Sequence, residues 1–441
     1  MIISKIKGRL PFVFVMMMIC IGFHASSQPV FNIRSFGAKA DGISDDYPAF
    51  IALAKAVNKA GRAKVVIPEG RYFIAAFHTE DNDQNDIEFK QCSSIEIDAK
   101  NAIILVNGNF KRTVDRKTGR HQFSKIRPVI PFSFKNCSNI IFNDLEIDGG
   151  VGQMTREPGI VESGSNLVRL FQCSHVSLNH LNLHHAETDA LYIIGDSSVD
   201  IHADQCIFSN NARQAMSVIG LVNGSFTGCQ FINTGITGGA YGRHKPSDGV
   251  DIEPRYAVRD ILFDHCIFSN NLGGQFVCTA PKYTSNINLK ACTIDAGSST
   301  RPFQLLLYAN GLVVDDCSID CGKGSIYATW KHGYDCVTEI RNCRIRSGAW
   351  GIYGLANDSS NCRINVHDNT LVNTADTVMV YFPCLKLPGL SFYNNAVKFE
   401  QAKVLLSKDG FTSVVEGNGR IEGNTFEAAF GTLKPSVSFR K

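Results

Sequence analysis

The 441-residue sequence predicts an all-β fold, a right-handed parallel β-helix in which short strands wind into stacked turns. Three observations support this prediction. A motif centred on Cys or Asn recurs with a usual spacing of about 23 to 26 residues, within the range of solenoid repeats. Each copy contains a short run of alternating apolar and polar residues, which is typical of a β-strand. No helical periodicity separates the copies, so a leucine-rich horseshoe or a βα barrel is not expected.

The recurring motif places a Cys between two strand segments, as in "ADQCIFSNN" and "FDHCIFSNN". The aligned positions are Cys137, Cys173, Cys206, Cys229, Cys266, Cys292, Cys317 and Cys343, followed by Asn369, Asn395 and Asn424. Equivalent residues of successive turns stack in a solenoid, so these side chains should form one buried ladder of free thiols and amides. The cysteines that fall off this ladder could still form a disulfide: Cys278, Cys321, Cys336, Cys362 and Cys384.

The region 28–78 differs from the repeats and predicts an N-terminal cap with the first turns. A strand and the loop "FGAKADGISDD" precede an amphipathic helix expected at 46–60, and "KVVIPEGRYFI" reads as strand, turn and strand. Such a helix would cover the open end of the stacked sheets, whose edges could otherwise pair with other chains.

These N-terminal motifs closely resemble the start of the pectate-lyase-like β-helix superfamily, where the same loop, helix and "VxIPxGxY" segment recur. With the ladder, the resemblance implies a single β-helix domain over residues 28–441. That superfamily includes polysaccharide lyases, glycoside hydrolases and phage tailspikes, so the resemblance indicates the fold rather than the reaction.

The first 27 residues read as a secretory signal peptide, with Lys5, Lys7 and Arg9 before an apolar run that is too short to span a membrane. We therefore expect a secreted or periplasmic protein without a membrane span, and a monomer. The formal net charge of +3 is small and dispersed, which excludes nucleic acid as the expected partner.

Charged residues concentrate on a second series of strands, which lies between the ladder turns. Alignment of "DALYIIG", "QAMSVIG", "DGVDIEP" and "GQFVCTA" predicts an inward apolar column with Leu191, Met216, Val250 and Val277. The outward column would then contain Tyr192, Ser217, Asp251 and Phe276. Arg213, Asp251 and Glu253 should converge there, and we expect them to be catalytic.

The substrate-binding residues are expected around this cluster. A long insertion at 236–247, "ITGGAYGRHKPS", should flank the groove, because such insertions usually build the walls of a binding site. The predicted substrate-binding residues are Asp189, Gln214, Tyr241, Arg243, His244, Lys245 and Arg255. Carboxylates surrounded by cations suit an acidic, uronate-containing polysaccharide or oligosaccharide.

A polysaccharide lyase is the first interpretation of this cluster. β-Elimination requires a neutralised uronate carboxylate, a base and a proton donor. Ca²⁺ held by Asp248, Asp251 and Glu253 could neutralise the carboxylate, because this hard cation prefers oxygen ligands. An arginine could do the same. Lys282 or His185 is the candidate base, and Tyr241 or His244 the candidate donor.

Two alternatives remain open from the sequence. A glycoside hydrolase would use Asp251 and Glu253 as its two carboxylates. The polygalacturonase-type motifs of the superfamily do not match, since "ETDAL" resembles the first one only loosely and "RQAMS" replaces the paired aspartates. A non-catalytic glycan-binding protein would instead expose aromatic platforms along the groove, for which the candidates are Phe276, Tyr308, Tyr327, Trp330 and Tyr353.

Overall fold

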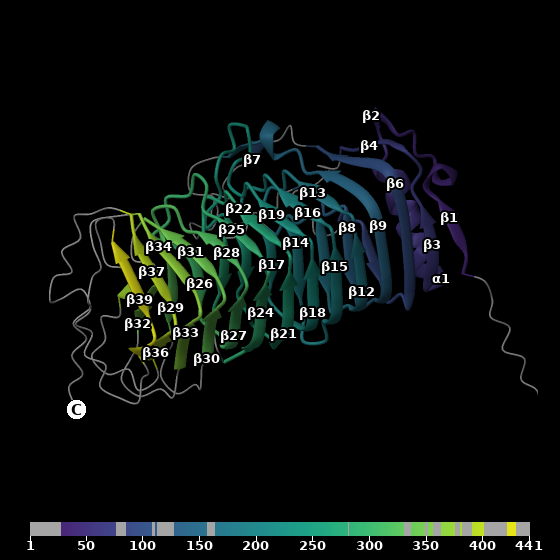
Figure 1. Ribbon diagram of the computed structural model, residues 1–441. Helices are drawn as coiled ribbons and strands as arrows, with labels where there is room; N and C mark the ends of the chain where they lie inside the picture. Colours follow the sequence, from purple (N-terminus) through teal and green to yellow (C-terminus); the bar gives the residue numbers. More distant parts are fainter. Residues whose placement is uncertain are drawn as a thin grey trace, which may run out of the picture.

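The computed structural model shows an elongated stack of parallel strands, which runs from the N-terminal helix to the C-terminal turns (Figure 1). It describes residues 28–75, 85–107, 111–112, 128–156, 164–280, 282–329, 337–348, 352–355, 363–374, 380–381, 390–400 and 421–428. Among these residues, neighbouring strands of each sheet run parallel, as the predicted parallel β-helix requires.

An 11-stranded sheet, called the B sheet below, contributes one strand to each turn. Its strands are β5 (Glu88–Lys90), β8 (Phe132–Lys135), β11 (Val168–Phe171), β14 (Asp189–Ile194), β17 (Gln214–Val218), β20 (Asp248–Ile252), β23 (Phe276–Cys278), β26 (Phe303–Leu307), β29 (Ser325–Thr329), β32 (Ile352–Leu355) and β35 (Val380–Tyr381).

A 26-stranded sheet supplies the other strands of each turn in two columns. The first column contains β1 (Val30–Asn32), β3 (Arg62–Val66), β12 (Ser174–Asn179), β15 (Val199–Asp204), β18 (Leu221–Thr227), β21 (Val258–Asp264), β24 (Thr284–Lys290), β27 (Asn310–Asp315), β30 (Val337–Arg341), β33 (Arg363–His367), β36 (Leu390–Tyr393) and β38 (Ile421–Glu422). The long strands β6 (Ser94–Val106) and β9 (Ser138–Asp148) run through both columns.

The second column contains β2 (Asp41–Asp45), β4 (Gly70–Ile74), β13 (Asn182–His184), β16 (Ile207–Ser209), β19 (Gln230–Ile232), β22 (Ile267–Ser269), β25 (Thr293–Asp295), β28 (Ser318–Asp320), β31 (Arg344–Ser347), β34 (Thr370–Asn373), β37 (Ala396–Phe399) and β39 (Thr425–Ala428). A separate two-stranded sheet pairs β7 (Lys111–Arg112) with β10 (Thr155–Arg156). Two short 3-10 helices, η1 (Ile33–Phe36) and η3 (Val151–Gln153), lie outside the sheets.

Helix α1 (Tyr47–Ala60) lies at the N-terminal end of the stack, within one residue of its expected start (Figure 1). It buries an apolar face on which Phe50 packs edge-to-face against Tyr72 and Phe132, with ring centroids 5.8 and 6.2 Å apart. The helix ends at Gly61, whose left-handed φ of 69° suits a residue without a Cβ. Its role as a cap stays a prediction.

Aspartates of the "ADGISDD" segment fix the loop that leads into this helix. The carboxylate of Asp41 accepts hydrogen bonds from the Ile43 and Ser44 N–H groups, which lower the pKa of Asp41 to about 2. Asp46, just before the helix, accepts bonds from the Lys39 and Ala40 N–H groups at 2.6 and 3.1 Å. These local hydrogen bonds explain why the segment contains aspartates, and no catalytic role is needed to account for them.

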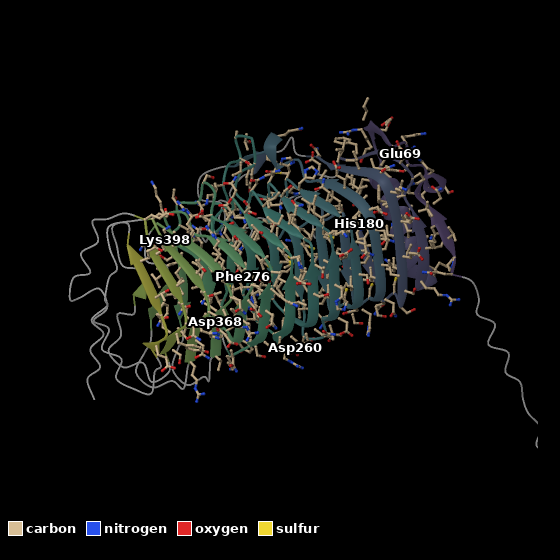
Figure 2. All side chains as sticks on the ribbon, in the orientation of Figure 1. Glu69, His180, Asp260, Phe276, Asp368 and Lys398 are labelled. Carbon is tan, nitrogen blue, oxygen red and sulfur yellow. The ribbon has the colours of Figure 1, made fainter. Side chains whose placement is uncertain are left out.

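One continuous apolar core fills the interior of the stack. Phenylalanines of successive turns stack in it, as in Phe226 on Phe263 with ring centroids 4.9 Å apart. The predicted register is wrong at one strand: Phe276 pairs with Val250 and faces the core, whereas Val277 pairs with Asp251. Phe276 is fully buried (Figure 2), so it is no aromatic platform for a ligand.

The ladder consists of two stacks at two different corners, rather than the single one predicted. Cys92, Cys137 and Cys173 stack where the B sheet meets the first column. From Cys206 onward the stack lies between the two columns, and Leu181 occupies that corner one turn earlier. Each ladder residue follows a residue of positive φ, such as Gln205 at 48°, which turns the chain between strands.

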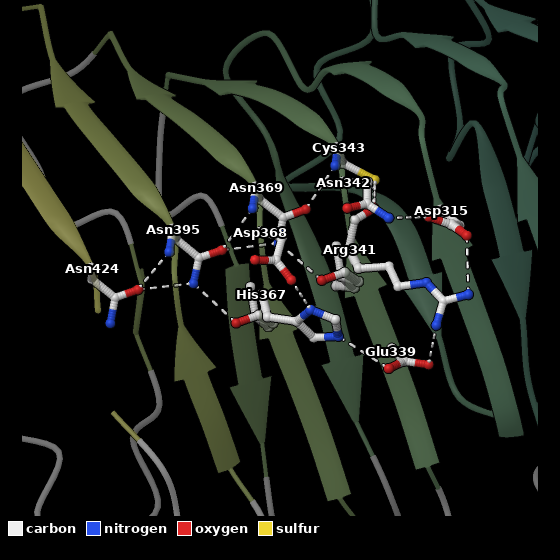
Figure 3. A network of polar contacts seen from close by, with 12 residues as sticks. Asp315, Glu339, Arg341, Asn342, Cys343, His367, Asp368, Asn369, Asn395 and Asn424 are labelled. Carbon is white, nitrogen blue, oxygen red and sulfur yellow. Dashed lines mark hydrogen bonds and ion pairs between the residues drawn. The ribbon is translucent and has the colours of Figure 1, made fainter. Parts of the chain in front are cut away.

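Side chains of the second stack bridge successive turns (Figure 3). The Cys343 thiol donates to the Val314 carbonyl oxygen at 3.5 Å, and the Asn369 amide donates to the Ile340 oxygen at 2.9 Å. The Oδ1 atom of Asn369 also accepts from the Cys343 N–H at 2.9 Å. The Asn369 amide therefore satisfies two backbone groups of the preceding turn, which a thiol does more weakly.

The described cysteines are free and buried, as predicted for the ladder thiols, and Cys278 and Cys321 are free as well. Burial raises the pKa of the Cys173 thiol to about 12, so this thiol stays protonated and unreactive. The other off-ladder cysteines, Cys336, Cys362 and Cys384, lie outside the described residues. So does the predicted signal peptide. Among the described residues, no helix has both the length and the apolar character needed to cross a membrane.

We predict that Asn369→Ala lowers the free energy of unfolding by roughly 1–3 kcal/mol, because it removes the side-chain partners of the buried Cys343 N–H and Ile340 C=O groups of the preceding turn. Asn369→Cys should cost less, since Cys occupies the equivalent position in the preceding turns. Urea denaturation of the three proteins measures the order. Equal losses for both variants would contradict the bridging role of this side chain.

Candidate functional site

The register of the B sheet brings the sequence-predicted cluster together on three neighbouring strands. Tyr192 of β14, Ser217 of β17 and Asp251 of β20 are paired across successive turns. Arg169 of β11 occupies the same position one turn earlier. Ordinary strand alternation is enough to place these side chains on the outer face. The apolar residues that alternate with them point into the core.

An open pocket of about 190 Å³ lies over this part of the sheet. Its lining residues are Gly164, Asn166, Arg169, Asp189, Tyr192, Arg213, Ser217, Ile219, Glu253 and Arg255. The polar lining thus combines two carboxylates with three guanidinium groups. Four residues predicted from the sequence, Asp189, Arg213, Glu253 and Arg255, are among them.

Asp189 is held at the bottom of the pocket by two neighbours. The Arg213 guanidinium donates to both of its carboxylate oxygens, at 3.1 and 3.3 Å, and the Ser217 hydroxyl donates to Oδ2 at 3.0 Å. The Asp189 side chain is only 3% exposed and that of Arg213 is 13% exposed. Arg213 therefore lies between buried acids, where it offsets their mutual repulsion.

Gln214 links the Asp251 carboxylate to the backbone of Asp248. Its side-chain Nε2 donates to Asp251 at 2.6 Å, and its Oε1 accepts from the backbone N–H of Asp248 at 3.0 Å. Asp248 in turn accepts from the Gly274 N–H at 2.6 Å and lies 3.6 Å from the Arg301 guanidinium. Gln214, predicted to bind substrate, is fully buried and orients the Asp251 carboxyl, and its role in binding stays a prediction.

Burial raises the pKa of Asp251 well above that of a free aspartate, and the charges of Asp248 and Glu253 raise it further. The positive charge of Arg213 acts against this increase. Burial also raises the pKa of Asp248, although the Gly274 N–H and nearby arginines oppose it. Asp251 is therefore the acid of the cluster that holds its proton most strongly.

Glu253 and Arg255 follow β20 and lie at the solvent side of the pocket, where both side chains are exposed. Their backbones are anchored to the preceding turn, since the Glu253 and Arg255 N–H groups donate to the carbonyl oxygens of Val218 and Ile219. The site therefore pairs a buried carboxyl of raised pKa, Asp251, with a solvent-accessible carboxylate two residues later.

The insertion at 236–247 packs against the stack rather than presenting all its polar residues to the pocket. Tyr241 is buried with Val151, Met154 and Ala212, and its hydroxyl donates to Glu187. His244 is buried, Lys245 is exposed, and Arg243 donates to the Ser247 hydroxyl and the Pro246 oxygen. These four predicted binding residues do not line the pocket. Their role in binding stays a prediction.

The two candidate bases of the elimination hypothesis also lie away from the pocket lining. Lys282 is exposed beside the Tyr283 ring, 5.2 Å from its centroid. His185 contacts His184 and Asp148, at 2.8 and 3.3 Å between the nearest atoms.

The predicted calcium ligands do not form a compact set of oxygen atoms. Within the described residues, the one group whose three candidate ligand atoms all lie within 4.8 Å of one another is Asp148, His184 and His185. Asp248 and Asp251 are buried and engaged by the hydrogen bonds described above. This arrangement fits a bound Ca²⁺ poorly, and we derive no chemical step from one.

Sequence reasoning missed Arg169 and Arg301. Arg169 donates to Asp86 and to the Ser133 hydroxyl and lines the pocket, and Arg301 is the ionic neighbour of Asp248. An alignment extended upstream to "NLVRLFQ" would have placed Arg169 in the same outward column as Tyr192. Arg301 lies in the turn before β26, and the alternation of strand residues does not predict where a side chain in a turn points.

No protein-family model and no curated protein matches the sequence. Among solved structures, the chain is similar to the A-module of the mannuronan C-5 epimerase AlgE6 of Azotobacter vinelandii, at 13% identity and a TM-score of 0.45, covering 92% of this chain and 99% of that one. It is also similar to PfbA, a surface adhesin of Streptococcus pneumoniae, at 12% identity and a TM-score of 0.46, covering 93% and 95% of the two chains.

A third similar structure is the catalytic unit of the GH87 α-1,3-glucanase of Streptomyces thermodiastaticus, at 11% identity and a TM-score of 0.44. The match covers 91% of this chain and 70% of the glucanase unit. Likenesses of this degree do not indicate a reaction or a ligand for this chain.

We predict that Asp251→Asn stabilises the protein at pH 8 but not at pH 4. A carboxyl with a raised folded-state pKa favours folding only while it is protonated, so that stabilisation is lost as the pH rises through the folded pKa. Asparagine retains the neutral state at every pH. Thermal unfolding of both proteins across this range should show a melting-temperature difference that grows with pH.

Asp315→Asn is the matched control with the opposite sign. Burial acts to raise the pKa of Asp315, but hydrogen bonds from Arg341 and Asn342 leave it lowered. This substitution should therefore destabilise the protein above the unfolded pKa, with a smaller effect at acidic pH. A pH-independent difference for Asp251→Asn would show that Asp251 ionises normally.

Proposed function

We propose that the protein is an exported carbohydrate-active enzyme that cleaves an acidic polysaccharide in the pocket over β14, β17 and β20. The observation that carries this proposal is the pair formed by Asp251, a buried carboxyl of raised pKa, and Glu253, an exposed carboxylate. Two carboxyl groups in such different environments suit an acid and a base, because burial makes Asp251 hold its proton more strongly than a free aspartate does, whereas Glu253 is open to solvent.

The arginines of the pocket support an anionic substrate. Arg169, Arg213 and Arg255 all line it, and their planar guanidinium groups can bind a carboxylate or sulfate through two hydrogen bonds. Arg255 is exposed and comes from the same turn as Glu253, so it is the arginine best placed to receive a charged sugar.

In this proposal Asp251 donates its proton to the leaving glycosidic oxygen. Glu253 acts on the opposite side of the bond, either by activating a water molecule or as a nucleophile. Arg213 reduces the repulsion among Asp189, Asp251 and Glu253, and Gln214 orients the Asp251 carboxyl. Glu253 lines the pocket directly, and Asp251, which does not, is paired in register with the pocket residue Ser217.

β-Elimination is the second candidate, and the pocket arginines are the observation that favours it. Arg213 or Arg255 could neutralise the uronate carboxylate and so acidify the adjacent proton. The candidate bases Lys282 and His185 do not line the pocket and do not lie on a strand of the B sheet, whereas Asp251 is paired in register with the pocket residue Ser217, which places elimination behind hydrolysis. The two reactions give different products, since only elimination forms an unsaturated uronate that absorbs in the ultraviolet.

We predict that Glu253→Gln lowers turnover of the cleaved uronate polysaccharide by roughly 10²–10⁴-fold, as expected for loss of an acid–base group. The assay follows ultraviolet absorbance and new reducing ends together, with and without EDTA, over a panel of uronate polysaccharides. Hydrolysis gives reducing ends without absorbance, and Lys282→Ala then retains activity.

Glu88→Gln is the matched control, because Glu88 lies in the same outward column of the B sheet but outside the pocket. A rise in absorbance abolished by Lys282→Ala would instead establish elimination, and its loss in EDTA would restore a metal to the reaction. Full activity of both Glu253→Gln and Asp251→Asn would contradict the assigned site. Binding without either product would identify a glycan-binding protein.

We further predict that Arg255→Ala raises KM for the acidic substrate roughly tenfold, the loss expected for one charge-assisted hydrogen bond, with little change in kcat. Steady-state kinetics at low and high salt measures this effect, which should shrink as salt screens the contact. Arg259→Ala, an exposed arginine paired with Asp260 on the first column, should leave KM unchanged. An unchanged KM for Arg255→Ala would remove this arginine from substrate binding.

A further inference from the structure

A second polar cluster lies outside the pocket, on the outer face of β9 and β13. Asp148 and His184 are paired in register at the ends of these two strands, and His185 follows directly. The side chains of Asp148, His184 and His185 are 33%, 14% and 32% exposed. None of the three lines the pocket.

The backbone of His185 brings two successive imidazoles to the same side. Successive residues of a regular strand point to opposite faces, which would separate these rings. His185 instead has a left-handed φ of 55°, a conformation that few residue types adopt. As a result the Nδ1 atoms of His184 and His185 face each other at 2.8 Å.

The Asp148 carboxylate completes a triangle with these two nitrogens. Its Oδ1 lies 3.3 Å from Nδ1 of His185 and 3.9 Å from Nδ1 of His184. A point equidistant from the three atoms lies about 2 Å from each, which is the length of zinc–nitrogen and zinc–oxygen bonds in proteins. Three ligand atoms therefore surround a space of the size that a transition-metal ion requires.

Neighbouring groups orient these side chains as ligands. The Nε2 atom of His184 lies 3.4 Å from the Glu146 carboxylate, so a proton on Nε2 leaves the Nδ1 lone pair directed into the triangle. The Gly150 N–H donates to Asp148 Oδ1 at 2.9 Å and fixes the carboxylate. Gly149 is required here, because a Cβ at this position would collide with the His185 carbonyl oxygen.

From this geometry we propose that Asp148, His184 and His185 bind one divalent transition-metal ion, with Zn²⁺ as the best fit. Two imidazoles and one carboxylate favour zinc and related metals over Ca²⁺ and Mg²⁺, which prefer oxygen ligands alone. The site is distinct from the acidic pocket. The ion would tie β9 to β13 beside η3, whose Val151 packs against Tyr241 of the insertion.

The test is calorimetric titration of metal-stripped full-length protein with ZnCl₂. We expect one Zn²⁺ per chain and a melting temperature that rises with free Zn²⁺, as binding to the folded state alone requires. His185→Ala and Asp148→Asn should each weaken binding at least tenfold. His180→Ala should not, although His180 also contacts a carboxylate, that of Asp144 at 3.1 Å.

Cobalt provides an independent readout, because visible absorption of bound Co²⁺ reports its coordination by nitrogen and oxygen. Loss of these bands in His185→Ala, with far-ultraviolet circular dichroism unchanged, would support the site. Absence of stoichiometric Zn²⁺ binding to the parent protein would overturn the proposal, as would equal binding by the parent protein and both ligand variants.

Discussion

The structure depends on the hydrogen-bonded stacking of turns whose strands keep the same register. At the corner between the two columns of the larger sheet, a residue of positive φ redirects the chain, and the Cys or Asn that follows bonds to the preceding turn. Because this corner recurs in each turn, strands far apart in the sequence stay aligned. The pocket is one consequence, since its residues come from strands that only register brings together.

The acidic cluster shows how a repetitive scaffold accommodates buried carboxyl groups that destabilise the fold when they ionise. Asp189 and Asp248 are buried with cationic partners, Arg213 and Arg301, whereas Asp251 is held by the neutral amide of Gln214. A buried carboxyl without a direct cation is destabilising when ionised, so its raised pKa follows from its position. Such local exceptions to an otherwise consistent core are expected at functional sites.

Much of the fold could be predicted because each turn repeats the same signals. The aligned strands correctly brought Asp189, Arg213 and Glu253 together. Two corners were merged into one ladder because Cys173 and Cys206 have similar neighbours in the sequence, although they lie at different corners. Alternation could not decide between Phe276 and Val277, since both are apolar.

Other features depend on contacts that no local pattern contains. The ion pair between Arg301 and Asp248 joins residues far apart in the sequence, and only the packed structure places them together. Tyr241 has the polar end of a binding residue, yet its ring is covered by Val151 and Met154 from an earlier turn. Residue type alone therefore overestimated how much of the insertion faces the pocket.

The insertion also shows that this fold separates loop length from strand register. Asn233 and its stacked partner Asn270 are 37 positions apart in the sequence, against 23 for Asp200 and Asn223 one turn earlier, yet Ser217 still pairs with Asp251. The added chain leaves the stack at a corner and returns to the same position. Loops at this corner can therefore be exchanged as modules, so that ligand preference can diverge, by evolution or by grafting, while the scaffold stays unchanged.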